Sequence, residues 1–348
     1  MPPLARGRIA IGLSHGEYVS GSMRAAIYEG PGGPEVITIG EVPKPEVRPD
    51  HIRVRVHAAG LNRADIIQRR GHYAAPSGWP ANIPGLEYAG EVEAVRPGVT
   101  QWRVGDRVMG LVGGGAQAEL VVVHQDEALP IPAGLSYEEA AAIPEAFLTA
   151  YDALVTRGRL QPRERVLIHA VGSGLGTAAS QIAKQLAATV IGTSRSSDKL
   201  ARALVYGLDV GIDTSRTPFP EAIGEPVDVV FDVLGGPALA DNLAVLAPRG
   251  RLILLGFLAG SQTTADLGPL LRKRLEIVGT VMRTRGLEER IPLVREFGNR
   301  MLPLFEPRFG QPAALRPVLE RTYPMTQLAD AHRVLEGNAT FGKVVVVW

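Results

Sequence analysis

A glycine-rich turn between two apolar runs constrains this chain more than any other feature. The run Val166–Ala170 precedes the turn, and an Ala-rich amphipathic segment and a second β-branched run, Thr189–Thr193, follow it. Three glycines alternate within the turn: Gly172, Gly174 and Gly176. This order predicts a parallel β-α-β unit, whose turn offers backbone N–H groups and a positive helix end to a dinucleotide pyrophosphate. Thr177 replaces the last glycine of a strict G-x-G-x-x-G, so a purely structural turn is an equally open interpretation of the motif alone.

The surrounding pattern favours the ligand-binding interpretation. Strand and helix patterns alternate from Phe147 to about Val281, with helical patterns at Asp198–Tyr206 and Pro237–Leu246. The predicted strands are Val166–Ala170, Thr189–Thr193, Asp209–Ile212, Val227–Val233, Arg251–Gly256 and Leu275–Val281. Six such strands are the number in a complete doubly wound dinucleotide-binding fold.

The segment before the alternating region predicts a separate β-rich domain, because short strands are broken by Gly and Pro. These strands are Arg24–Tyr28, Val36–Val42, His51–Ala58, Tyr88–Val95, Arg107–Leu111 and Ala118–Val123. Between them, Gly60–Pro84 is predicted to be loop-rich, and its polar side chains are either site residues or a solvated loop. Near the end, Leu287–Phe305 and Gln327–Glu336 predict helices and Lys343–Trp348 a strand.

We therefore expect an α/β chain of several parts. The predicted boundaries are a flexible extension at 1–22, a β-rich domain at 23–145, a nucleotide-binding domain at 146–284 and a C-terminal segment at 285–348.

Composition excludes several classes of function. The 348 residues include no cysteine, which rules out disulfides, thiolate catalysis and Cys-ligated zinc. A formal net charge of +1 provides no broad field for nucleic acid or an anionic membrane. No run reaches the roughly 20 apolar residues of a membrane span. These properties predict a cytoplasmic protein that binds a small molecule, with no nucleic acid or membrane partner.

Local motifs resemble the zinc-free quinone oxidoreductase branch of the medium-chain dehydrogenase/reductase superfamily, most closely its tumour-suppressor-inducible type. The motifs are Gly32-Gly-Pro-Glu35, Ala58-Ala-Gly-Leu-Asn-Arg-Ala-Asp65, Gly85-Leu-Glu-Tyr-Ala-Gly90, Val104-Gly-Asp-Arg-Val108, Ala142-Ile-Pro-Glu-Ala146 and Phe341-Gly-Lys-Val-Val345. The resemblance implies that residues 23–145 form a GroES-like catalytic domain, which the return segment 285–348 completes. It also implies that residues 146–284 form a Rossmann domain that binds NADPH, and that the protein is a homodimer.

Two positions separate this branch from the zinc-dependent alcohol dehydrogenases of the superfamily. Asn62 stands where the resemblance places a metal-binding Cys, and Leu86 replaces the His of a Gly-His-Glu motif. Neither an amide nor a leucine side chain is a strong zinc ligand. Without a metal to polarise a carbonyl, the substrate must accept hydride readily, as quinones and conjugated enones do.

The resemblance supplies four candidates for the catalytic site. Tyr73, in a loop similar to the family's substrate loop, either donates a hydrogen bond or proton to the reduced oxygen or only stacks on the substrate. Asn62 and Asp65 are expected near the substrate, and Asp65 has an alternative role as a structural hydrogen-bond acceptor. Ser173 matches a family serine of the cofactor and active site, although a turn serine that bonds its own backbone is the alternative.

The end of the second predicted strand favours NADPH over NADH. NAD-binding folds place an acid about 20 residues after the turn, whereas this chain has Ser194, Arg195 and Ser196, followed by Lys199. The resemblance assigns the 2′-phosphate to Ser196 and Lys199, with Thr214 in place of a tyrosine. Each charge-assisted contact is worth about 1.5–3 kcal/mol, or roughly ten- to a hundredfold in affinity. Solvent-exposed cations without a ligand are the alternative.

The remaining cofactor residues also come from the turn and from the resemblance. They are Thr149, Gly172, Ser173, Gly174, Leu175, Gly176, Phe257, Phe341 and Lys343. We expect NADPH-dependent reduction of quinones. The alternatives are an enone or alkenal double-bond reductase on the same fold, and a non-catalytic NADPH-binding protein.

Overall fold

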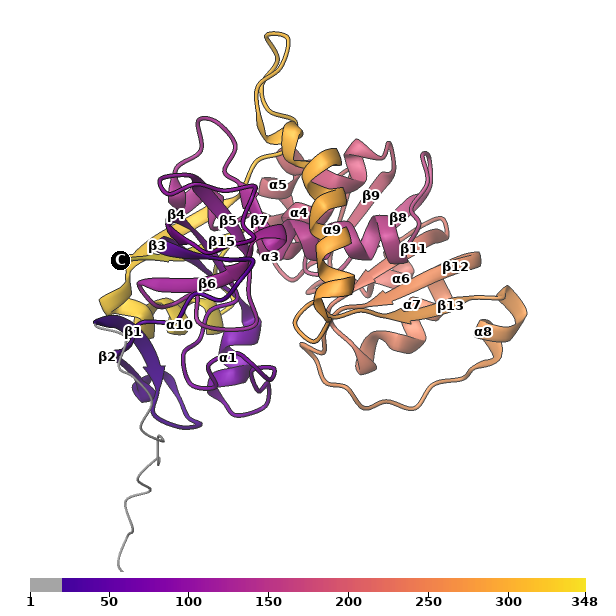
Figure 1. The fold of residues 1–348 in the computed structure, drawn as a ribbon. Coiled ribbons are helices and arrows are strands. Elements are labelled where there is room, and N and C mark those ends of the chain that lie inside the picture. Colours follow the sequence, from indigo (N-terminus) through magenta and orange to yellow (C-terminus); the bar gives the residue numbers. More distant parts are fainter. Residues whose placement is uncertain (1–20) are drawn as a thin grey trace, which may run out of the picture.

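The computed structural model describes residues 21–348. Almost all of the predicted extension at 1–22 therefore lies outside the described residues. Two large sheets lie side by side, and the C-terminal segment returns to the sheet formed by the N-terminal half (Figure 1). The predicted α/β class, with a β-rich domain and a six-stranded Rossmann-type sheet, is confirmed.

The Rossmann-type sheet contains six strands, all parallel. Its strands are β8 (Arg165–Ile168), β9 (Thr189–Ser194), β10 (Val210–Asp213), β11 (Val227–Asp232), β12 (Leu246–Leu254) and β13 (Glu276–Gly279). Their order across the sheet is β10-β9-β8-β11-β12-β13. The chain changes direction between β8 and β11, and open α/β sheets bind ligands outside the carboxyl ends of the strands at such a point.

Helices cover this sheet and connect its strands. They are α4 (Gly174–Gln185), α5 (Ser197–Ala203), α6 (Phe219–Ala222), α7 (Leu239–Val245) and α8 (Gly268–Lys273). Ala178, Ala179 and Ala183 of helix α4 are buried, and their small side chains let the helix pack closely against its neighbours behind the glycine turn.

The other large sheet has seven strands: β3 (His51–Leu61), β4 (Glu87–Val95), β5 (Arg107–Leu111), β6 (Leu120–His124), β7 (Ala128–Pro130), β14 (Leu319–Pro324) and β15 (Lys343–Val347). Strands β1 (Ser22–Tyr28) and β2 (Ile37–Pro43) form a separate pair. Strand β15 pairs antiparallel with β3, which brings Lys343 beside Leu61 and the residues that follow it.

The predicted loop-rich region, Gly60–Pro84, contains one helix, α1 (Arg63–Arg69). The backbone N–H of Asn62 donates to Asp65 Oδ2 at 2.8 Å, a contact typical of a helix N-terminus. The prediction of an irregular segment was wrong at this position because the Asn-x-x-Asp capping signal was overlooked.

The remaining helices lie around the sheet of seven strands and between the two sheets. They are α2 (Tyr137–Ala140), α3 (Pro144–Tyr151), α9 (Leu287–Arg300) and α10 (Leu328–Glu336). One turn of π-helix, η3 (Asp152–Arg157), continues α3 toward the Rossmann-type sheet.

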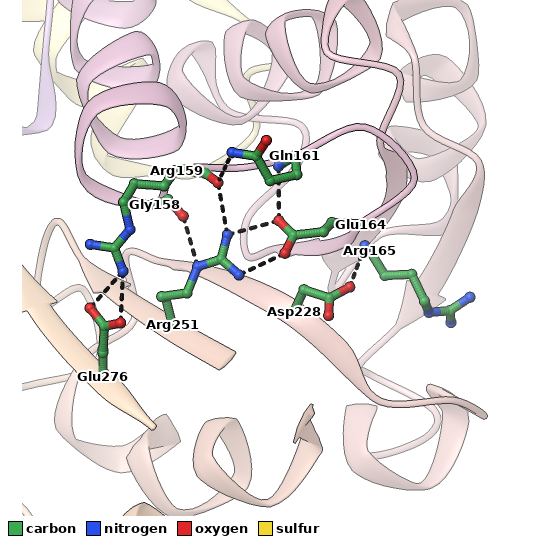
Figure 2. A network of polar contacts seen from close by, with 8 residues as sticks. All are labelled: Gly158, Arg159, Gln161, Glu164, Arg165, Asp228, Arg251 and Glu276. Atoms are coloured by element: carbon green, nitrogen blue, oxygen red, sulfur yellow. Dashed lines mark hydrogen bonds and ion pairs between the residues drawn. The ribbon is translucent and has the colours of Figure 1, made fainter. Parts of the chain in front are cut away.

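Buried Arg251, on β12, links the end of η3 to the edge of the Rossmann-type sheet at which the amino ends of its strands lie (Figure 2). Its guanidinium donates to the carbonyls of Gly158 and Arg159 at 2.8 and 3.0 Å, and to both carboxylate oxygens of Glu164 at 2.8 and 2.7 Å. Arg159 in turn donates to Glu276 on β13 at 2.7 Å. This network lies at the edge opposite the carboxyl ends of the strands, so it supports the framework rather than a ligand site. Within residues 21–348, no helix is both long and apolar enough to cross a membrane.

Candidate active site and cofactor site

The glycine turn connects β8 to α4 at the carboxyl edge of the sheet. Ser173 is the N-cap of α4, and its Oγ accepts a hydrogen bond from the N–H of Gly176 at 3.0 Å. A Cβ on Gly176 would lie 2.5 Å from the carbonyl oxygen of Ala170, so only glycine permits this approach of helix to strand. Ser173, Gly174 and Leu175 are half-exposed, whereas Gly172 before them and Gly176 after them are buried. The turn therefore leaves the positive end of α4 accessible to an anion.

The segment Phe341-Gly342-Lys343 crosses the same turn. The N–H of Gly342 donates to the carbonyl of Gly172 at 2.9 Å. A Cβ on Gly172 would lie 3.1 Å from Phe341 Cδ2, and a Cβ on Gly174 would lie 2.5 Å from Lys343 Cδ. Phe341 and Lys343, two predicted cofactor residues from the C-terminal segment, therefore lie against the glycine turn.

The residues predicted to bind the 2′-phosphate lie close together at the carboxyl ends of β9 and β10. Thr214 Oγ1 donates to the carbonyl of Ser194 at 3.3 Å, and Ser194 Oγ accepts from the N–H of Ser196 at 3.1 Å. Ser196 Oγ caps α5 by accepting from the N–H of Lys199 at 3.3 Å. Lys199 Nζ donates to the carbonyl of Asn338 at 2.6 Å, and Arg195 is exposed.

These residues fit a dinucleotide. The three residues at the start of α4, Ser173 to Leu175, are half-exposed. Two cations and three hydroxyls lie after β9 and β10: Arg195, Lys199, Ser194, Ser196 and Thr214. No carboxylate stands between the end of β9 and Asp198. Among the residues from 21 onward, Thr149 Oγ1, on α3, is buried and has no hydrogen-bond partner, as a group that bonds to a ligand would be. Phe257, 56% exposed, lies after β12 at the same edge.

A buried ion pair lies next to the turn. Lys343 Nζ forms a salt bridge with Glu87 Oε1 and donates to Asn62 Oδ1 at 2.7 Å and to the carbonyl of Leu61 at 3.0 Å. Asn62 Nδ2 donates to the same Glu87 oxygen at 2.9 Å, and the N–H of Glu145 donates to Glu87 Oε2 at 2.7 Å. The ammonium of Lys343 is thus held by the protein itself.

Asp65 is fully buried beside this ion pair. Its two carboxylate oxygens accept from the N–H groups of Asn62 and Gly85, at 2.8 and 3.3 Å. Burial raises the pKa of Asp65 to about 6, although the N–H of Asn62 and the charge of Lys343 oppose the rise. These contacts match the structural alternative for Asp65.

Tyr73 lies under a guanidinium from the other end of the chain. Arg283 is centred 4.7 Å from the Tyr73 ring centroid, and it donates to the carbonyl of Tyr73 at 3.1 Å. It also donates to Gln68 Oε1 at 2.7 Å and to the carbonyl of Gly113 at 2.9 Å. Burial, followed by the nearby Glu145 carboxyl, raises the pKa of Tyr73, so the phenol stays protonated at neutral pH.

Sequence reasoning overlooked Arg283, and it overlooked Glu145 as a neighbour of Glu87 and Tyr73. Arg283 follows β13 and carries no local motif, because its three partners are 170 to 215 residues away in the chain. Glu145 occurs inside the family motif Ala142–Ala146, so a charged residue among apolar neighbours was the available signal. Within residues 21–348, no three His, Asp or Glu side chains gather as candidate metal ligands.

Comparisons with known proteins agree with this geometry. The family "alcohol dehydrogenase GroES-like domain" matches residues 48–133, and the family "zinc-binding dehydrogenase" matches residues 174–298. Quinone oxidoreductase of Pseudomonas aeruginosa is 33% identical over 327 residues, which cover 91% of this chain and 97% of that protein. The chain belongs to the medium-chain dehydrogenase/reductase superfamily, in its quinone oxidoreductase/VAT-1 branch.

Other members of the superfamily align over almost the whole chain. The human synaptic vesicle membrane protein VAT-1 homolog is 30% identical over 348 residues, covering 93% of this chain and 86% of that protein. The quinone oxidoreductase of Thermus thermophilus, solved also in complex with NADPH, has a TM-score of 0.77 and 34% identity, covering 94% of this chain and all of that one. The chain is a quinone oxidoreductase-like member of this superfamily, and NAD(P) binding is typical of the branch.

Proposed function

We propose that the chain is an NADPH-dependent, zinc-independent reductase that transfers hydride to quinones. The observation that supports this most directly is the ion pair of Lys343 and Glu87 beside Asn62. Lys343 brings a positive charge to the place where the zinc-dependent relatives would need a cation, and Leu86 offers no ligand atom. A zinc ion would meet repulsion here, so the reaction suits an acceptor that needs no Lewis acid.

The residues toward the cofactor have separate tasks in this proposal. The N-terminal turn of α4 binds the pyrophosphate, Thr149 hydrogen-bonds to the nicotinamide end, and Ser196 and Lys199 bind the 2′-phosphate. The bound nicotinamide supplies hydride. NADPH binding by the Thermus thermophilus relative supports this choice of cofactor.

Replacing Lys199 with methionine should raise the dissociation constant for NADPH about tenfold and change that for NADH by less than about twofold. The reason is that only NADPH carries the phosphate that the ammonium would bind. Titration calorimetry with both cofactors measures the two constants. Lys44→Met, which removes an ammonium directly after β2 in the other half of the fold, is the matched control. Equal weakening of both cofactors would contradict the assignment.

Tyr73 is the proposed donor to the substrate oxygen. Its phenol is half-exposed, and Arg283 holds its ring and its carbonyl from one side. A hydrogen bond from the phenol stabilises negative charge that develops on the oxygen of a quinone as hydride arrives.

The decisive experiment is turnover by the purified protein. With NADPH and 1,4-benzoquinone or 9,10-phenanthrenequinone, we expect loss of NADPH absorbance, and we expect the rate to survive prior treatment with a zinc chelator. Rates with α,β-unsaturated ketones distinguish a quinone reductase from an enone reductase. NADPH binding without turnover of either class would favour a non-catalytic protein.

We also propose a homodimer that pairs through β13. This strand is at one edge of its sheet, and Ile277 and Val281 are exposed there. An unpaired strand edge offers N–H and C=O groups to a second copy. Light scattering should give the mass of two chains, and a monomer mass would refute this proposal.

A further inference from the structure

One face of helix α3 points away from the core. Six of the eight residues of α3 are buried, and the two half-exposed residues are Glu145 and Thr149. They are four positions apart, so they lie on the same face of the helix, one turn from each other. Because the rest of α3 is packed between the two sheets, this face is its accessible side.

The polar side-chain groups on this face have no hydrogen-bond partner within residues 21–348. In the part of the chain that the structure describes, the Glu145 carboxyl accepts no hydrogen bond, and only its backbone N–H is used, toward Glu87. Thr149 Oγ1 is buried and has no partner either. Two unpaired oxygen groups on one face are unusual in a folded protein unless a ligand or solvent completes them.

Burial, followed by the charge of Glu87, favours the protonated form of Glu145. Glu87 on β4 and Asp65 on α1 are the nearby acids, and Lys343 on β15 and Arg283 after β13 are the nearby cations. Burial is the largest effect and the charge of Glu87 the second, and together they raise the pKa of Glu145 to about 7. At about pH 7, Glu145 is therefore protonated in about half of the protein molecules.

The two neighbouring acids, Glu87 and Asp65, are less suited than Glu145 to donate a proton. Glu87 is fully buried, and its two oxygens are bonded to Lys343, Asn62 and Glu145. Asp65 is also fully buried, with an N–H donor on each oxygen. Glu145 is half-exposed as a residue, and within residues 21–348 it is the acid of this cluster whose carboxyl makes no hydrogen bond.

We propose that Glu145 supplies the proton that quinone reduction consumes, by restoring the proton of Tyr73. This rests on the proposed function. Hydride brings one proton and two electrons to the quinone, and the resulting anion needs one more proton to become a quinol. The O–H bond of Tyr73 breaks as the new O–H bond forms on the quinol. The Tyr73 oxygen then takes the proton of Glu145, directly or through water, and solvent reprotonates Glu145.

The variant Glu145→Gln tests this proton relay, because glutamine keeps the shape of the side chain and the backbone N–H to Glu87. Turnover of unmodified protein with 1,4-benzoquinone should fall as pH rises through about 7, since the protonated fraction of Glu145 falls there. At about pH 6 the variant should be about tenfold slower, and its turnover should lack this descending limb. Tyr73→Phe should lose the same limb, and Glu145→Asp should restore part of it.

A second measurement needs neither cofactor nor turnover. Infrared difference spectra of the cofactor-free protein between about pH 5.5 and 8.5 should contain a carboxyl band that titrates near 7, separate from that of Asp65 near 6. The band should be absent in Glu145→Gln and present in Glu288→Gln, which alters an exposed glutamate in the first turn of α9. Circular dichroism checks that each variant is folded.

The outcomes separate this relay from the proposed function. If the unmodified protein reduces no quinone, the proposed function and the relay both fail. If it reduces quinones but Glu145→Gln keeps the full rate and the descending limb, the relay alone is refuted. A folded Glu145→Gln that still has the band titrating near 7 assigns the proton to another carboxyl and also refutes the relay.

Discussion

Replacing Lys343 with methionine should lower the free energy of unfolding by about 3–5 kcal/mol. The ammonium is the cation bonded to Glu87, whose side chain is fully buried, and it also donates to Asn62 and Leu61. Without it, a carboxylate is left in the interior beside two carbonyl oxygens that have lost their donor. Thermal unfolding followed by circular dichroism should give a midpoint about 10 °C lower.

Two further variants test the cause of that loss. Lys184→Met removes an ammonium 2.9 Å from Asp209 on the surface, where we expect a loss below about 1 kcal/mol. Adding Glu87→Gln to Lys343→Met removes the buried charge and should recover part of the stability. Lys343→Met could instead keep the unfolding midpoint of the unmodified protein and bind NADPH much more weakly. That result would mean that Lys343 binds the cofactor, as the family resemblance implies.

The Rossmann-type half of the fold was predictable because its strands are buried on both faces. Parallel strands between two helical layers have sequences dominated by buried apolar residues, as in Val229–Phe231 of β11, and turns between them contain glycine. Strands β7 and β14 were not predicted. The first has only three residues, and the second, Leu319–Pro324, is half-exposed and has no apolar run, because it lies at the sheet edge beside β15.

The candidate site was predictable only where its residues are close in sequence. Ser173 and the glycines share one turn, and Ser196 and Lys199 share the first turn of α5, so motif spacing was enough to group them. The contacts of Lys343 with Asn62 depend on the antiparallel pairing of β15 with β3, across 281 residues. Their assignment to cofactor or substrate stays a prediction, because hydrogen bonds within the protein do not identify a ligand.

Arg283 illustrates the same limit, and its replacement by methionine should have the largest effect on activity. We expect kcat/KM for quinones to fall about a hundredfold, while the dissociation constant for NADPH changes little. Methionine fills much of the same volume but donates no hydrogen bond, so the carbonyls of Tyr73 and Gly113 and the amide of Gln68 lose a shared donor. The Tyr73 ring also loses the cation above it.

The reason for so large an effect is that Arg283 joins two parts of the chain that must act together. Its own segment is fixed to η3, since Arg285 donates to Asp152 at 3.0 and 2.6 Å. A guanidinium on this fixed segment holds the Tyr73 loop in one position, and a shift of about 1 Å in a reacting group can cost a hundredfold in rate. Steady-state kinetics and NADPH titration measure the two effects separately. Arg295→Met, at an exposed position of α9, should leave both values unchanged, and full activity in Arg283→Met would mean that the loop holds its position without this contact.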